Sequence, residues 1–443
     1  MRRLSALGLA LSFSTAVPLL VACSPDRPDS VVLVVVDTLR ADHLGAYGYP
    51  RPTSPSFDAW AAAGRLFEEA HSTSPWTLPS VASILTGLEP ARHGAGRREE
   101  GEKRAFTGLG TDVSTLAARL SDAGWKTGAI VNNPFLHEKF GVSRGFGSWD
   151  YHSANRSQGR RADASVDAAL AWLDGVGDVP FFLFLHVIDP HLAYDAPAPF
   201  LGRFSDGAPS PMRRRRLSWI REQVRRDDAF DFAPLIAAYD EEVLFVDAQL
   251  GRLRRGLEER ALDGRTLVVV TSDHGEEFGD HGGFEHGHSV HEELLHVPLL
   301  LVGPGVDAGR TSAPVTLLDV APTILEALGV GLGSELPGSS LLAEPPTGRT
   351  LVAERTLYGD EEKAAIRWPW KLLWTPESGT LALFDLDADP GELRDRLPEE
   401  PAIAERLHEL LEALAALEAQ EPGGSAVLDA DTERELRSLG YID

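Results

Sequence analysis

The stretch Val-Val-Leu-Val-Val-Val-Asp-Thr at residues 31–38 decides the fold. Its six apolar residues form a run of strand length without polar alternation, which is typical of a strand buried on both faces. Asp37 and Thr38 follow the run directly. Because ligands bind beyond the carboxyl ends of the strands in open parallel sheets, we expect Asp37 to lie at a binding edge.

Four further apolar runs of strand length occur along the chain, at residues 127–131, 181–186, 266–271 and 299–302. Patterns typical of helices alternate with them, at residues 56–70, 79–86, 113–124, 164–174, 235–260 and 316–328. This alternation predicts an α/β fold with a mainly parallel central sheet flanked by helices.

The character of the sequence changes near Pro345-Pro346-Thr347-Gly348, which is typical of a linker. Beyond it we expect a small C-terminal antiparallel-sheet subdomain at 346–420, with strands at 364–368, 371–374 and 382–385 and a helix at 402–417. A polar tail is expected at 421–443. The catalytic α/β domain is accordingly placed at 23–345.

The first 22 residues are typical of a signal peptide: Arg2 and Arg3 precede an apolar run that ends in Leu20-Val21-Ala22-Cys23. That ending resembles the lipobox of bacterial lipoproteins, which implies cleavage before Cys23 and its lipidation. The alternative is an uncleaved N-terminal membrane helix. We expect a lipid-anchored protein of the cell envelope, on the outer membrane because Ser24 follows the cysteine. Cys23 is the only cysteine, so disulfides are excluded.

The net charge of −25 argues against nucleic acid as a partner, because nucleic-acid binding needs a basic surface. A local exception is residues 213–226, which contain seven arginines. This run is either a solvated basic element beside acidic neighbours or a patch that holds an anionic substrate or lipid headgroups.

Polar residues follow the other predicted strands as well, and parallel strands deliver such residues to a single edge. They are Asn132 and Asn133, Asp189 and His191, and Asp273 and His274. Two carboxylates with an imidazole suit a divalent metal ion, manganese or zinc above calcium or magnesium. We therefore predict a metal site made of Asp37, Asp273 and His274.

A nucleophile for such a site is offered by Trp76-Thr77-Leu78-Pro79, which precedes the predicted helix at 79–86. At a helix N-terminus, partial positive charge favours an alkoxide and an incoming anion. Coordination to the metal would acidify the Thr77 hydroxyl further. The structural alternative is that Thr77 only caps the helix.

These residues resemble the sulfatase family of the alkaline phosphatase superfamily. The resemblance covers most of the chain after residue 30. It includes Val-Val-Val-Asp-Thr-Leu-Arg at 34–40, Trp-Thr-Leu-Pro-Ser at 76–80, Leu-His-Val-Ile-Asp-Pro-His at 185–191, Ser-Asp-His-Gly-Glu-Glu at 272–277 and Phe-Asp-Leu-Asp-Ala-Asp-Pro-Gly-Glu at 384–392. It implies that Asp37, Asp273 and His274 bind the catalytic metal together with Thr77, which stands at the nucleophile position.

The resemblance also implies a set of substrate contacts. His191 matches a histidine that contacts the ester group, and His286 matches the phosphate-contacting histidine of lipid-A and teichoic-acid phosphotransferases. Asn133, or Asn132, is expected to face the ester oxygens. His288 is either an acid for the leaving group or part of the scaffold.

The chain departs from the sulfatase pattern at three positions. Thr77 stands where sulfatases carry the Cys or Ser that is oxidised to formylglycine, and its branched carbon cannot give that aldehyde. Val81 replaces the arginine of that signature, and Thr38 replaces a second Asp. Threonine nucleophiles in this superfamily belong mainly to phosphoester enzymes, so we expect phosphate ester chemistry through a covalent Thr77 intermediate.

Several alternatives stay open at this point. A transferase that modifies envelope glycans or lipids would use the same residues as a hydrolase. A sulfate ester hydrolase without formylglycine and an inactive surface binding protein are further possibilities. One metal ion is favoured over two, although Asp189, His191 and His286 would be the ligands of a second.

Overall fold

The computed structural model describes residues 27–100, 103–152, 159–205, 217–227, 229–333, 336–418, 424–426, 428–439 and 441–442. The signal segment, Cys23 and Arg213–Arg216 lie outside these residues. Within the described part, no helix has the length and apolarity that a membrane span requires.

A parallel half-sheet carries the strand ends predicted to form the site. β1 (Ser30–Val36) lies between β8 (Phe181–Val187) and β9 (Thr266–Ser272), parallel to both. β6 (Lys126–Val131) continues the sheet beyond β8, and β7 (Ser148–Tyr151) lies at its edge, again in parallel. The mainly parallel sheet is confirmed, and its carboxyl ends share one edge.

In the other half of the eight-stranded sheet, the strands are no longer all parallel. β12 (Leu299–Val302) is antiparallel to β9, β2 (Arg65–Phe67) is antiparallel to β12, and β13 (Gly309–Thr311) is parallel to β2. The site therefore forms on the parallel side, where several strands end at the same level.

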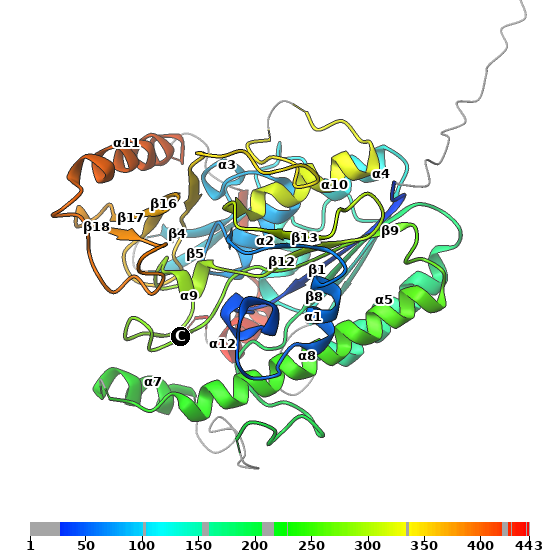
Figure 1. Cartoon of the computed structure of the whole chain (residues 1–443), viewed down its shortest axis with the longest axis horizontal. Helices are drawn as coiled ribbons and strands as arrows, with labels where there is room; N and C mark the ends of the chain where they lie inside the picture. Colours follow the sequence, from blue (N-terminus) through cyan, green and yellow to red (C-terminus); the bar gives the residue numbers. More distant parts are fainter. Residues whose placement is uncertain are drawn as a thin grey trace, which may run out of the picture.

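Helices cover both faces of the sheet, as Figure 1 shows. One face carries α2 (Thr77–Thr86), α4 (Leu116–Asp122) and α10 (Val320–Leu328). The opposite face carries α1 (Pro55–Ala61), α5 (Ala162–Val176) and α8 (Ala233–Glu259). The described chain also contains short elements: β3 (Ala70–His71), α3 (Pro90–His93), β4 (Gly96–Glu100), β5 (Lys103–Gly108), α7 (Leu217–Arg226), β10 (Glu277–Phe278), β11 (Phe284–Glu285), α9 (Glu292–Leu295) and β14 (Val315–Thr316).

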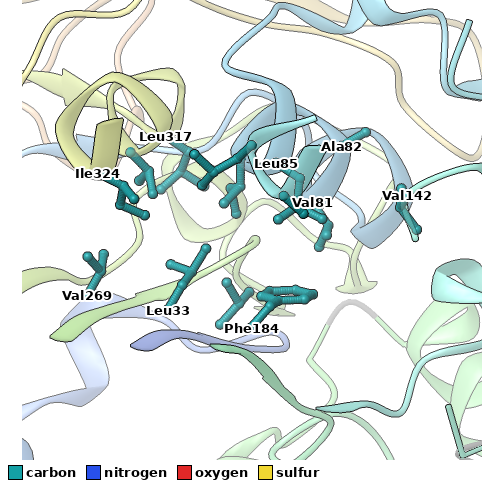
Figure 2. Close-up of a cluster of buried hydrophobic side chains, with 14 of the residues drawn as sticks. Leu33, Val81, Ala82, Leu85, Val142, Phe184, Val269, Leu317 and Ile324 are labelled. Atoms are coloured by element: carbon teal, nitrogen blue, oxygen red, sulfur yellow. The ribbon is translucent and has the colours of Figure 1, made fainter. Parts of the chain in front are cut away.

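Successive residues of β1 enter different cores, because side chains alternate between the faces of a strand. Leu33 packs with Val81 and Leu85 of α2, as Figure 2 shows, and it belongs to the core on that face. Val34 belongs to the core formed with α5 and α8. Both faces of β1 are therefore apolar, which explains the unbroken run at 31–36.

The C-terminal subdomain is an antiparallel sheet, as predicted. Its strands are β15 (Leu351–Ala353), β16 (Lys363–Arg367), β17 (Trp370–Thr375) and β18 (Thr380–Asp385). α11 (Pro401–Glu418) packs on this sheet through Leu407 and Leu411.

One prediction of local structure is wrong, and the tail contains elements that the sequence analysis did not predict. The helix expected at 56–70 ends at Ala61, and the chain then enters β2. Gly64 makes this possible, because a Cβ at that position would lie 2.3 Å from the Leu301 carbonyl oxygen of β12. The tail beyond 421 contains β19 (Gly424–Ala426), paired with β5, and α12 (Ala430–Leu439), whose Leu436 is buried. Thr432 and Leu436, one helical turn apart, are the buried side chains of the described part of α12.

Candidate active site

Three predicted metal ligands meet at the carboxyl edge of the sheet. Asp37 follows β1, while Asp273 and His274 follow β9, its neighbour in the sheet. His274 Nε2 lies 3.6 Å from Asp37 Oδ1 and 3.7 Å from Asp273 Oδ2. The three side chains are fully buried, and their ligand atoms lie within 4.8 Å of one another. Such convergence is the geometry that a divalent ion requires.

The electrostatics of this cluster also fit a cation. Burial, followed by repulsion from Asp273, raises the pKa of Asp37 well above its usual value. Burial likewise raises the pKa of Asp273. Among the described groups, Asp37 Oδ1 and Asp273 Oδ2 have no hydrogen-bond partner. Two buried carboxylates facing each other are unfavourable unless a positive charge compensates them, so these residues are a plausible site for the divalent metal.

A strained backbone position directs Asp37 into the site. Thr38 has a φ of 58°, which is rare for a β-branched residue. Its carbonyl accepts a hydrogen bond from the Tyr239 hydroxyl at 2.7 Å, and its amide donates to Asp273 Oδ1 at 3.3 Å. These bonds hold the turn that follows β1, and such strained positions cluster at functional sites.

Thr77 begins α2, and its hydroxyl points to the metal cluster. Thr77 Oγ1 lies 3.4 Å from His274 Nε2 and accepts a hydrogen bond from Asn133 Nδ2 at 3.1 Å. The N-cap of α2 is Trp76, which makes no side-chain capping bond. Since Thr77 occupies the first helical position, its hydroxyl is available for chemistry at the positive end of the helix.

The loop before Thr77 is held by the C-terminal subdomain. The Trp76 indole and the Ser74 hydroxyl both donate to the carbonyl of Arg355, the latter over 3.3 Å. Glu354 N donates to Thr73 O at 3.0 Å. The position of the candidate nucleophile thus depends on residues that lie far away in sequence.

The structure separates the two asparagines that follow β6. Asn133 Nδ2 donates to Asp37 Oδ2 at 2.8 Å as well as to Thr77. Asn132 instead accepts from Arg160 and donates to Ser165 and to the His186 carbonyl. Asn133 is therefore the one that faces the site.

His191 and His286 lie side by side next to the metal cluster. Their ring centroids are 5.1 Å apart, and the ring of His286 lies 4.5 Å from that of His274. His286 Nδ1 is 2.8 Å from Glu276 Oε1, and the Tyr194 hydroxyl donates to Glu276 Oε2. Burial, followed by the neighbouring His286, lowers the pKa of His191 to about 3. Burial also lowers the pKa of His286 well below its usual value.

Two other predicted residues make contacts elsewhere. His288 Nε2 lies 2.5 Å from Glu277 Oε2, which favours the scaffold role over that of leaving-group acid. Asp189 accepts from Ala162 N at 2.7 Å, at the start of α5, and lies 3.7 Å from the Arg161 guanidinium. Among the described residues, the groups with metal-ligand spacing are Asp37, Asp273 and His274, and His281, His291 and Glu392; Asp189, His191 and His286 do not form such a group.

Three residues of the site were missed by the sequence analysis. His186 ends β8, is fully buried, and places Nε2 3.5 Å from Asp37 Oδ2. Glu276 supports His286. Tyr441, from the expected polar tail, is hydrogen-bonded to His191. His186 and Glu276 lie in strand-end segments that the sequence analysis identified as functional, so their positions pointed to the site. For Tyr441, the only feature of the sequence that could have indicated a role is its aromatic side chain.

The basic run is described in part. Arg221 of α7 forms a bidentate pair with Glu285, its Nε 2.5 Å and its Nη2 2.9 Å from the carboxylate oxygens. Arg225 and Arg226 pair with Glu222 on the same helix. In this part of the run, acidic neighbours already neutralise the arginines. This favours the alternative of a solvated basic element over that of a patch that holds an anionic ligand.

Comparisons with known proteins agree with the geometry. A protein-family model described as Sulfatase matches residues 29–330. An arylsulfatase of Clostridium perfringens is 25% identical over 452 aligned residues, which cover 84% of this chain and 90% of the relative.

Solved structures share the fold. A protein bound to its substrate D-glucosamine-2-N,6-O-disulfate superimposes with a TM-score of 0.72 at 21% identity, covering 90% of this chain and 99% of the other. A phosphonate monoester hydrolase of Agrobacterium radiobacter gives a TM-score of 0.69 at 20% identity, covering 88% and 96% respectively.

Proposed function

Because this chain belongs to the sulfatase family of ester hydrolases, we propose that it cleaves phosphate esters through a covalent Thr77 intermediate. The observation that carries the proposal is the Thr77 hydroxyl, which stands beside a buried two-carboxylate, one-imidazole cluster. A threonine there supports direct attack by an alcohol, because its branched carbon cannot give the formylglycine aldehyde.

The reaction has two displacements. The Thr77 oxygen loses its proton and attacks phosphorus while the ester P–O bond breaks in line, and the leaving oxygen gains one proton to become the alcohol, so that protons balance. Water then attacks the phospho-threonine, and the bond from phosphorus to Thr77 breaks. A divalent ion held by Asp37, Asp273 and His274 would lower the pKa of the Thr77 hydroxyl and neutralise charge on the ester.

The remaining residues of the site position the ester group. Asn133 fixes the Thr77 oxygen through its Nδ2 donor and thereby limits the direction of attack. His191 and His286 lie beside each other next to His274, where an anionic group would favour their N–H donors. The carboxylate of Glu276 orients His286 through Nδ1 and leaves Nε2 for the substrate.

Sulfate esters are the second candidate substrate class. The family name, the arylsulfatase relative and the disulfated glucosamine bound by a structural relative all favour them. On a glycan, the same site would attack sulfur in place of phosphorus without formylglycine. A transferase would share the first displacement and pass the group to an acceptor hydroxyl in place of water.

The membrane context is part of the proposal. Leu-Val-Ala-Cys at residues 20–23 supports a lipid anchor on Cys23 that holds the enzyme at the cell envelope. Mass spectrometry of the chain from its native membrane tests this, since an unmodified Cys23 would contradict it.

The central experiment compares Thr77→Ala, Thr77→Ser and Thr86→Ala on a panel of aryl phosphates, phosphodiesters and aryl sulfates, with Mn²⁺ or Zn²⁺ added. Thr86 is the control, because it ends the same helix and its hydroxyl bonds to the Ala82 carbonyl. We expect Thr77→Ala to lose at least about 1,000-fold in kcat/KM, while Thr77→Ser and Thr86→Ala stay active. Full turnover by Thr77→Ala would refute the nucleophile. Adding an acceptor alcohol separates transfer from hydrolysis.

A further inference from the structure

The C-terminal segment, meaning the described residues from 424 to 442, places a tyrosine inside the active site. The Tyr441 hydroxyl lies 2.7 Å from His191 Nε2 and 3.4 Å from Asn133 Nδ2. The Thr77 hydroxyl is also close enough to interact with the phenol. The phenol oxygen thus lies within hydrogen-bond distance of two groups assigned to the ester and close to the third.

Contacts on both sides of α12 fix this arrangement. β19 pairs with β5, and Lys139 binds Asp429 at 2.9 Å. The Tyr151 hydroxyl donates to Glu435 at 2.5 Å. The Tyr441 ring packs edge-to-face on Phe135, with centroids 4.7 Å apart. The segment, whose helix is drawn in red in Figure 1, is therefore docked by specific contacts.

The docked segment leaves the nucleophile without access to solvent. Thr77 and Asn133 are fully buried, and Tyr441 itself is 2% exposed. An ester oxygen that bonds to His191, Asn133 and Thr77 needs the space that the phenol oxygen fills. Both oxygens cannot be accommodated at once.

We propose that the C-terminal segment is an intramolecular occupant of the ester-group site, with the Tyr441 phenol in the place of a substrate oxygen. Substrate then binds only when the segment moves away. The proposal rests on the proposed function only for the assignment of His191, Asn133 and Thr77 to the ester group.

The polar contacts that hold the C-terminal segment can be broken at a moderate cost in free energy. The pair Lys139–Asp429 involves an aspartate side chain that is 63% exposed, and such pairs contribute little to stability. Opening withdraws Leu436 and Tyr441 from the edge of the core on this face of the sheet, whereas the core on the opposite face contains no residue of the segment. If the open form is about one tenth of the population, the apparent affinity for an ester is reduced about tenfold.

The first test is binding of inorganic phosphate to the full-length, manganese-loaded protein by calorimetry, in a Thr77→Ala background. This readout needs no chemistry, so it stays interpretable if the nucleophile assignment fails. We expect Tyr441→Ala to tighten phosphate binding about tenfold. Unchanged or weaker binding by Tyr441→Ala would overturn the proposal, and weaker binding would make Tyr441 a substrate-binding residue.

A second variant acts from outside the site. Tyr151→Phe removes the bond to Glu435 and leaves the ester-group residues untouched, so it should tighten phosphate binding by a smaller factor than Tyr441→Ala does. Hydrogen exchange adds a direct measurement: saturating phosphate should increase exchange of the amides of α12. Slower exchange in α12 upon phosphate binding would mean that the segment closes over its ligand, contrary to the proposal.

Discussion

Two buried clusters of carboxylates and histidines lie in this molecule, and their charges are arranged in opposite ways. In the metal cluster, Asp37 and Asp273 face each other, and the basic groups that the structure places within 4 Å of them are the rings of His186 and His274. In the second cluster, which we call the lysine cluster, Lys371 lies between Glu292 at 2.7 Å and Glu392 at 2.9 Å.

The pKa values express the same contrast. Burial raises the pKa of both aspartates of the metal cluster. Burial acts on Glu292 in the same direction, but Lys371 outweighs it and holds the pKa of Glu292 well below its usual value. Buried carboxylates that already have a cationic partner are structural, whereas buried carboxylates without one need a cation from outside.

The lysine cluster joins the two parts of the chain. Glu292 belongs to α9 of the catalytic part, while Lys371 and Glu392 belong to the C-terminal subdomain. His71 adds a contact to Glu292 at 3.1 Å, and His291 adds one to Glu392 at 3.0 Å. The ion pairs of Lys371 thus connect the two parts, and within the cluster His291 and Glu392 also have metal-ligand spacing together with His281.

The largest effect that sharpens this contrast is expected from Asp273→Asn. Loss of a ligand should reduce kcat/KM at least about 1,000-fold. The metal-free protein should be as stable as the native one or more stable, because the repulsion between Asp37 and Asp273 is relieved. Urea unfolding with a chelator measures the stability, and a clear loss of metal-free stability would break the contrast.

Lys371→Met should have the next largest effect, and on stability rather than on chemistry. It leaves Glu292 and Glu392 buried without a cation, which costs about 3 kcal/mol of unfolding free energy. The matched control is Arg254→Met, whose pair with Glu258 is solvent-exposed and contributes about 0.3–0.5 kcal/mol. Equal unfolding midpoints for the two variants would refute the structural role of Lys371.

His286→Gln tests a residue that borders the metal cluster without belonging to it. We expect kcat/KM to fall about 100-fold, as for the loss of one donor to a developing charge. Metal affinity, measured by titration with Mn²⁺, should stay within a factor of about three, because His286 is not a ligand. A large loss of Mn²⁺ affinity would instead assign His286 to the metal.

The smallest effect concerns pH. A hydrogen bond to Glu293 raises the pKa of His281, which stacks on His291, from 6.5 to about 9. The protonated form is therefore favoured in the folded state, so its stabilisation is fully present below pH 6.5 and disappears as the pH rises through 9. We expect about 1 kcal/mol between these limits, reduced by solvent screening. His281→Gln should lose this part of the pH dependence in thermal unfolding profiles, and an unchanged profile would contradict it.

The sequence was informative wherever function coincides with strand ends. The run at 31–36 predicted a strand buried on both faces, and Asp37, Asp273, His274 and Asn133 do meet at one edge. The sequence predicted this edge because an uninterrupted apolar run and the polar residue that follows it are both local features. The helix prediction at 56–70 failed because the close approach of Gly64 to β12 is a tertiary contact.

Long-range contacts account for the rest. Tyr441 is hydrogen-bonded to His191, which lies 250 positions away in the sequence, and the residues next to Tyr441 in the sequence do not predict this contact. The same holds for His186, which the sequence placed correctly on a strand but whose nearness to Asp37 depends on the order of β1 and β8. The lysine cluster could not be predicted either, since Lys371 meets Glu292 only through the packing of the C-terminal sheet against α9.

The loop before Thr77 donates two hydrogen bonds to the Arg355 carbonyl, and this has a consequence for how the enzyme becomes active. A nascent chain that ends at residue 330 contains every candidate metal ligand and Thr77. It lacks the Arg355 carbonyl, which accepts the hydrogen bonds of Ser74 and Trp76 in the folded protein. We therefore expect the enzyme to acquire activity only after the C-terminal subdomain has folded against the rest.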